Sequence, residues 1–132
     1  MYEPEGLPYN SKNYIEAIQV LHGWIENKLQ EILILTGAND HGSEMKTVWN
    51  IANQINLVTC VHVLFVLSQL SENEYQMIIK FNGLRNQLIH KIYNDPYEEI
   101  NQGFPKEKYD EGYKIGIELA DILQIKTELR LQ

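Results

Sequence analysis

Side chains suited to chemistry are concentrated in one short stretch, GLRNQLIHKIYN, residues 83–94. Within it, Arg85 and Asn86 are adjacent, and His90 follows four residues after Asn86. The planar guanidinium of arginine matches the oxygens of a phosphate, and an imidazole gains or loses a proton near neutral pH. We therefore interpret this stretch as a candidate site for a phosphate group, with a proton-transferring side chain nearby.

The charge of the chain is unevenly distributed around this stretch. A formal net charge of -7 argues against a protein that coats nucleic acid through a broad basic surface, and DNA is not an expected partner. No acidic residue lies between Glu74 and Asp95, however, while Lys80, Arg85 and Lys91 fall within that window. A solvated lysine face would account for Lys80 and Lys91 but not for Arg85. The window therefore concentrates the capacity for anion binding in one place.

Four segments carry apolar residues at helical spacing, after an irregular lead-in over residues 1–12. The pattern predicts helices over about 13–35, 44–70, 71–93 and 106–129, separated by short polar segments and a polar loop before the last helix. The length of 132 residues indicates a single domain over 1–132. The predicted fold is all-α, an up-and-down bundle of four helices.

Capping residues support these boundaries. Ser43 is a candidate N-cap for the second helix. The β-branched residues at 58–66 would also suit a β-strand, but the helical spacing before them favours one long central helix. Ser71 with Glu74 three residues later is the capping-box pattern, so the third helix should begin almost at once and run antiparallel to the second. Pro96 predicts the end of the third helix near Tyr93.

Nothing in the sequence predicts association with a membrane. The longest apolar run, LVTCVHVLFVL, is too short to span a bilayer, and no secretory signal is recognisable, so we expect a cytoplasmic protein. Cys60 lies within this run and has no partner cysteine, which indicates a small core residue.

Arg85 lies within the apolar arc of its predicted helix, flanked by Phe81 and Leu88. A buried guanidinium without a partner costs several kcal/mol, so the fold must compensate it. The best internal candidate is Glu26 in the middle of the first helix. The alternative is a cleft or a subunit interface in which Arg85 binds an external anion.

Other polar and aromatic residues have less specific interpretations. His22 and Glu26 are four residues apart and form either a polar patch behind the site or a surface pair. His62 is interpreted as a core histidine, and Trp24 and Trp49 as core or interface residues.

The hexapeptide RNQLIH, residues 85–90, near the end of the third helix of a small helical bundle, resembles the R-x4-H signature of the HEPN family (higher eukaryotes and prokaryotes nucleotide-binding domains). The resemblance extends over most of the chain: a long first helix with a central glutamate, an apolar second helix, a short break before the motif helix, and a closing helix. It implies a HEPN-like four-helix bundle that forms a homodimer through the motif helix.

Family members with this pattern are metal-independent ribonucleases, many of them toxins or phage-defence proteins. The resemblance implies that Arg85 binds the scissile phosphate, that His90 acts as general acid or base on the 2′-hydroxyl or the leaving 5′-oxygen, and that Asn86 orients one of them. RNA is then the substrate, and neither a metal nor a cofactor is expected.

Lys91, Tyr93 and Glu26 are the expected substrate-binding or supporting residues. In the toxin branch that pairs with a nucleotidyltransferase antitoxin, one residue separates the histidine from a tyrosine, whereas two residues separate His90 from Tyr93. This departure weakens the case for nucleotide attachment to Tyr93. An antitoxin remains a candidate partner.

Two alternatives stay open. A HEPN-like bundle could bind a nucleotide or a protein without cleaving anything, because a fold does not determine an activity. A helical interaction module could also carry the motif by coincidence. The nuclease and the binding module both predict that Arg85 and His90 approach a second subunit, whereas the interaction module predicts that they are sealed inside one chain.

Overall fold

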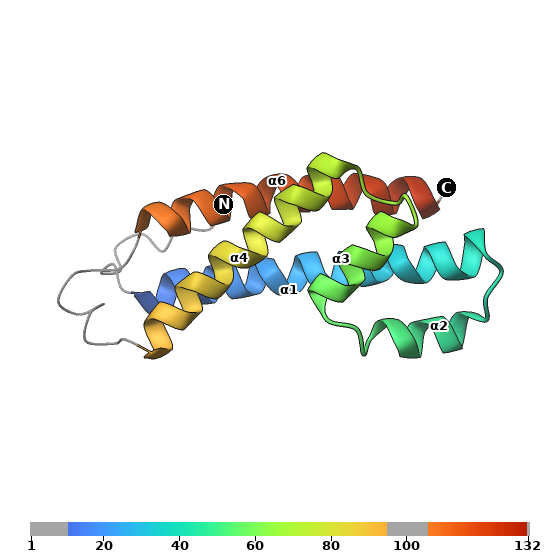
Figure 1. Ribbon diagram of the computed structural model, residues 1–132, viewed down its shortest axis with the longest axis horizontal. Helices are drawn as coiled ribbons and strands as arrows, with labels where there is room; N and C mark the ends of the chain where they lie inside the picture. The colour runs from blue at the N-terminus through green and yellow to red at the C-terminus, as the bar shows by residue number, and fades with distance from the viewer. Residues whose placement is uncertain (1–10, 95–105, 132) are drawn as a thin grey trace.

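The computed structural model describes residues 11–94 and 106–131, and this part of the chain is all-helical, without a strand. Five α-helices and one π-helical turn pack together (Figure 1). In chain order they are α1 (Ser11–Leu35), η1 (Thr36–Asp40), α2 (Met45–Ala52), α3 (Leu57–Val66), α4 (Glu72–Asn94) and α6 (Lys106–Leu131).

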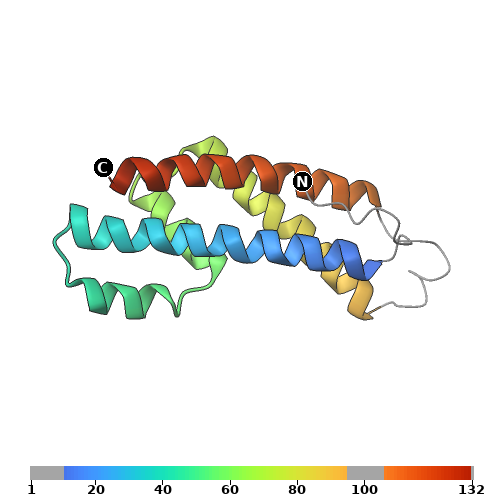
Figure 2. The same ribbon diagram turned by 180° about the vertical axis from the view of Figure 1, so that it is seen from behind.

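The first helix buries the face that its sequence predicts. Side chains of α1 at three- and four-residue spacing are at most 9% exposed: Tyr14, Ile18, Leu21, Ile25, Leu29 and Ile32. Helix α6 runs beside α1 in the same direction, and Tyr14 contacts Tyr109 with ring centroids 4.6 Å apart. Helix α4 crosses one face of this pair in the opposite direction, as the front and back views both show (Figures 1 and 2).

Two glycines allow α6 to approach its neighbours closely. A Cβ atom at Gly116 would lie 2.7 Å from Cε1 of Phe81 on α4 and would collide with Leu21 on α1. A Cβ atom at Gly112 would lie 3.3 Å from Cδ1 of Ile18. Packing therefore explains a glycine at position 116 despite its low helical propensity, whereas at position 112 a side chain would make a tight contact.

The prediction of one helix over 44–70 is wrong. Helix α2 ends at Ala52, and Asn56 caps a new helix, α3, by accepting a hydrogen bond from the backbone N–H of Thr59 at 2.9 Å. Asparagine favours this capping geometry over a helix interior, so the polar NQIN segment ends one helix and starts another. The N-cap of α2 is Glu44 rather than Ser43, with its carboxylate 2.7 Å from the N–H of Thr47.

This additional reversal changes the topology. Because α2 and α3 are separate helices, α1 and α6 run parallel, whereas the first and last helices of an up-and-down four-helix bundle are antiparallel (Figure 1). The helical class was predicted correctly, but the described residues form five α-helices in place of the expected four.

The predicted start of α4 is confirmed. The N–H of Ser71 donates to Oε1 of Glu74 at 2.8 Å, and the N–H of Glu74 donates to Oγ of Ser71 at 3.1 Å, which is the reciprocal capping box. Before it, Ser68 ends α3 with a positive φ of 61°. Its N–H donates to the carbonyl of Phe65, and that of Gln69 donates to the carbonyl of Leu64, so the turn is a Schellman motif.

The ends of the long helices differ slightly from the predictions. Helix α1 begins at Ser11, two residues before the predicted start, and α4 continues to Asn94. The rest of the lead-in and the predicted loop before α6 lie outside the described residues. No helix in the described ranges combines the length and the apolar character needed to cross a bilayer.

Candidate functional site

Arg85 lies half-buried where α4 crosses α1. Its Nε and Nη2 atoms donate to Oε1 of Gln19 on α1, at 3.0 and 2.7 Å. Its Nη1 atom donates to Oδ1 of the adjacent Asn86 at 2.9 Å. The guanidinium is thus compensated by two amide oxygens that carry no net charge.

The expected partner, Glu26, makes no ion pair with Arg85 in the described part of the chain. Burial lowers the pKa of Arg85, and the negative charge of Glu26 partly offsets this effect. Glu26 therefore acts on the guanidinium only through space. Gln19, seven residues earlier on α1, occupies the position of contact because the antiparallel crossing places residue 85 opposite residue 19.

Arg85 differs in this respect from the other arginine of the chain. Arg130 is paired with Asp40 at 3.0 Å. Lys80 is similarly paired with Glu111 at 2.8 Å, and Lys126 with Glu74 at 3.1 Å. Among the residues described, Arg85 is thus a half-buried cation whose charge is not matched by a carboxylate in contact with it.

His22 belongs to the same contact between helices. Its Nε2 atom lies 3.1 Å from Oδ1 of Asn82, and its ring stacks over Phe81 at a centroid distance of 6.1 Å. Burial lowers the pKa of this imidazole, and the charge of Arg85 lowers it further. Of the two interpretations of His22 and Glu26, the structure favours a polar patch behind the site, with Asn82 rather than Glu26 as the hydrogen-bond partner of His22.

We call this set of polar residues the α1–α4 seam; its members are Gln19, His22 and Glu26 on α1, and Asn82, Arg85 and Asn86 on α4. Sequence reasoning missed Gln19 and Asn82. Each lies three residues from a seam residue that was identified, Gln19 before His22 and Asn82 before Arg85, and this spacing was an available signal.

The outer flank of the seam is open. A Cβ atom built at Gly83 on α4, or at Gly23 on α1, would have no atom of the described chain within 4 Å. Both glycines lie in helix interiors, where alanine would be favoured by up to about 1 kcal/mol. A close approach within the chain therefore does not explain them, as it explains Gly116.

The predicted catalytic residues do not all point the same way from α4. Arg85 and Asn86 are in direct contact, and His90 is exposed one turn beyond Asn86. Residues five apart in an α-helix project in directions that differ by roughly 140°. Arg85 faces α1 while His90 lies on the solvent side, so one α4 helix does not aim both side chains at one phosphorus atom.

The structure also bears on four other residues interpreted from the sequence, namely Lys91, Tyr93, His62 and Cys60. Lys91 and Tyr93 fall on the last turn of α4, and their side chains lie outside the described part of the structure. The prediction of a core position for His62 is wrong, since this residue is exposed, with its ring 5.9 Å from that of Tyr75. Cys60 is buried as predicted, and burial raises the pKa of its thiol to about 12. Cys60 is thus unsuited to act as a thiolate nucleophile.

Neither tryptophan lies in the core, so the prediction that Trp24 and Trp49 are core residues is wrong. Trp24 is 38% exposed on α1 and Trp49 is 55% exposed on α2. The interface alternative for them stays a prediction. Trp24 is also covered in part by Lys28, whose Nζ lies 5.3 Å from the ring centroid.

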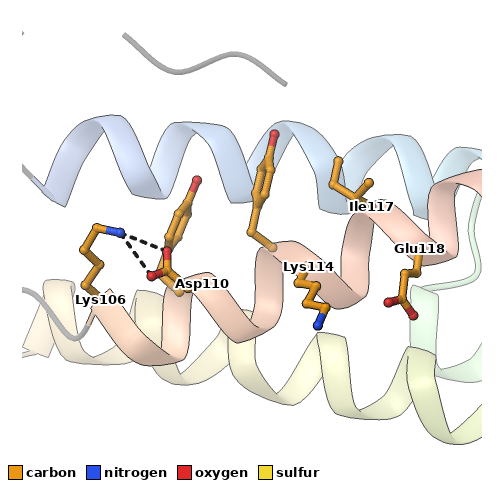
Figure 3. Close-up of a pocket in the computed structure, with 7 residues that line it drawn as sticks. Lys106, Asp110, Lys114, Ile117 and Glu118 are labelled. Carbon is orange, nitrogen blue, oxygen red and sulfur yellow. Dashed lines mark hydrogen bonds and ion pairs between the residues drawn. The ribbon is translucent and has the colours of Figure 1, made fainter. Parts of the chain in front are cut away.

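A separate pocket lies along α6 (Figure 3). Its lining is made of residues from this one helix: Lys106, Tyr109, Asp110, Tyr113, Lys114, Ile117 and Glu118. Lys106 forms an ion pair with Asp110 at 3.0 Å. The lining carries two lysines and two acidic residues, so its formal charges balance. The described residues hold no cluster of three side chains suited to a metal ion.

The described residues form an all-helical fold with a half-buried arginine between two antiparallel helices, and no carboxylate among these residues contacts that arginine. In comparisons with protein-family models, curated proteins and solved structures, nothing matches this chain. The function must therefore be inferred from the site itself.

Proposed function

We propose that the protein is a HEPN-like, metal-independent endoribonuclease of the toxin or phage-defence kind, which acts in the cytoplasm as a homodimer. The observation that supports this proposal most is the environment of Arg85, a cation held in place by amide oxygens and contacted by no carboxylate of the described residues. Such a guanidinium keeps its positive charge for an external anion, and a phosphodiester is the anion that its fork fits best. In this proposal α1, α3, α4 and α6 correspond to the four helices of the HEPN-like bundle.

A dimer resolves the divergent directions of Arg85 and His90. If two α4 helices pair so that His90 of one subunit lies beside the exposed edge of the Arg85 guanidinium of the other, both side chains face the same phosphate. The imidazole removes the proton of the 2′-hydroxyl, the 2′-oxygen attacks phosphorus, and the bond to the 5′-oxygen breaks. The imidazolium returns the proton to that oxygen, which leaves a 2′,3′-cyclic phosphate, while Arg85 stabilises the charge on the pentavalent phosphorus.

The remaining residues have supporting roles in this scheme. Asn86 contacts the guanidinium directly and orients it. Lys91 and Tyr93 extend the substrate-binding surface along the last turn of α4, and Glu26 tunes the charge of the seam from a distance. An antitoxin would restrain the activity by covering this surface.

The proposal is tested by incubating purified protein with a mixed-sequence RNA in the presence of EDTA. Wild type should produce fragments that end in a cyclic phosphate, and Arg85→Ala and His90→Ala should each abolish this cleavage. Arg130→Ala and His41→Ala are matched controls, because they remove the same groups from exposed or ion-paired positions away from the seam.

Circular dichroism of every variant distinguishes a loss of catalytic activity from a loss of the folded structure. If folded wild type binds RNA and cuts none of it, the alternative of a non-catalytic binding module is favoured and the nuclease is refuted. Inhibition of cleavage by EDTA would contradict the metal-free mechanism.

A further inference from the structure

The contact between Gln19 and Arg85 leaves a specific part of the guanidinium available. An arginine side chain has five N–H groups, and three of them are used, by Oε1 of Gln19 twice and by Oδ1 of Asn86 once. Within the described part of the chain, one N–H on each terminal nitrogen remains without an acceptor. Two such donors can bind two oxygens of one phosphate, which is the bidentate mode that gives arginine its selectivity for this group.

Whether residue 19 carries an amide or a carboxylate determines whether the charge of Arg85 is neutralised. A glutamate at residue 19 would offer the same reach and a carboxylate in place of the amide, and it would neutralise the guanidinium. A glutamine accepts the same two hydrogen bonds and leaves the positive charge unmatched. Gln19 is half-buried on α1 next to the core residue Ile18, and its acceptor oxygen is fixed by two hydrogen bonds from Arg85.

We infer that Gln19 is a positioning residue: it fixes the direction of the Arg85 guanidinium and preserves its charge for a phosphate of the substrate. Helix α1 is then part of the site, although the sequence motif lies entirely on α4. The role in RNA binding rests on the function proposed above. The role in orienting Arg85 rests on the contact itself, and the two are tested separately.

The charge is tested with Gln19→Glu, and Gln30→Glu is the matched control. Gln30 is half-buried on the same helix and lies roughly 16 Å further along its axis. The probe is a fluorescent 2′-O-methyl oligoribonucleotide, which lacks the attacking hydroxyl, and binding is followed by anisotropy. We expect Gln19→Glu to raise the Kd by about tenfold or more and Gln30→Glu by less than about twofold.

A purely structural role makes the opposite prediction. The carboxylate introduced by Gln19→Glu would pair with Arg85, so a structural residue would keep or increase the urea midpoint of unfolding and leave the Kd at the level of the Gln30→Glu control. That combination overturns the inference. A weakened Kd in a variant at least as stable as wild type supports it.

The orientation is tested without RNA, through the side-chain Nε–H signals in 15N NMR. The chain has two arginines, so Arg130→Lys assigns the Arg85 signal directly. We expect the Arg85 Nε–H to exchange slowly with water in wild type and much faster in Gln19→Leu. Unchanged exchange in Gln19→Leu overturns the positioning role. If wild type binds no probe but the exchange result is as expected, the RNA function fails and the positioning of Arg85 stands.

Discussion

Replacement of Gly116 by alanine should destabilise the protein, whereas the same replacement at Gly83 should stabilise it. At Gly116 the added methyl group would lie 2.7 Å from Cε1 of Phe81 and would collide with Leu21, and both neighbours are buried. Phe81 lies one turn from Arg85 on α4, and Leu21 lies two residues from Gln19 on α1. The variant therefore probes the packing that brings α1 and α4 together at the seam.

The magnitude follows from two opposing terms. Overpacking against two buried side chains costs about 2–3 kcal/mol, and the higher helical propensity of alanine returns about 1 kcal/mol. The net loss for Gly116→Ala is about 1–2 kcal/mol. At Gly83 no atom of the described chain lies within 4 Å of the new methyl group, so only the gain of roughly 0.5–1 kcal/mol applies.

Urea unfolding followed by circular dichroism measures both free energies. The two variants should differ by about 1.5–3 kcal/mol, which separates their midpoints by roughly 1–2 M for a domain of this size. Gly23→Ala, also without a neighbour within 4 Å, is a second control and should match Gly83→Ala. If Gly116→Ala is as stable as wild type, α6 does not pack against Phe81 and Leu21 as described, and the placement of the seam loses its basis.

Three further predictions concern single residues. The lowered pKa of His22 means that the unfolded chain binds its proton first, so stability should fall as the pH decreases from about 6.5 towards the lower pKa of the folded state. His22→Gln should flatten this part of the pH profile of the urea midpoint. An unchanged profile would contradict the burial of His22 near the charge of Arg85. Ser68→Gly should raise the free energy of unfolding by about 1 kcal/mol in the same assay, because glycine adopts the positive φ at the end of α3 without strain. A loss of stability would show that the Ser68 side chain contributes more than the backbone strain costs. Cys60 should react with Ellman's reagent at pH 8 only in urea, because it is buried and the pKa of its thiol is raised to about 12. Rapid reaction of the folded protein would contradict the core position of Cys60.

Local signals in the sequence were sufficient for much of the helical structure. The capping box of Ser71 and Glu74 and the apolar face of α1 involve residues three or four apart, and both were predicted correctly. The break before Asn56 was missed because the apolar spacing continues across it. A single capping side chain decided between one helix and two.

Contacts between distant residues could not be predicted in the same way. Gln19 and Arg85 are 66 residues apart, and their pairing depends on the register with which α4 crosses α1. The sequence favours Glu26 because it is a carboxylate in the middle of the first helix, one position past the apolar Ile25. The crossing places an amide there instead, and this difference leaves the charge of Arg85 unmatched, the feature that supports the proposed function.

The most direct test of a composite ribonuclease site is subunit mixing. Arg85→Ala and His90→Ala proteins, each inactive, are denatured together, refolded as a mixture and assayed on RNA in EDTA. A heterodimer of the two contains one intact site, with Arg85 from one chain and His90 from the other, so an equal mixture should recover about a quarter of wild-type activity. A mixture that stays as inactive as its components, alongside active wild type, would contradict a site shared between two subunits.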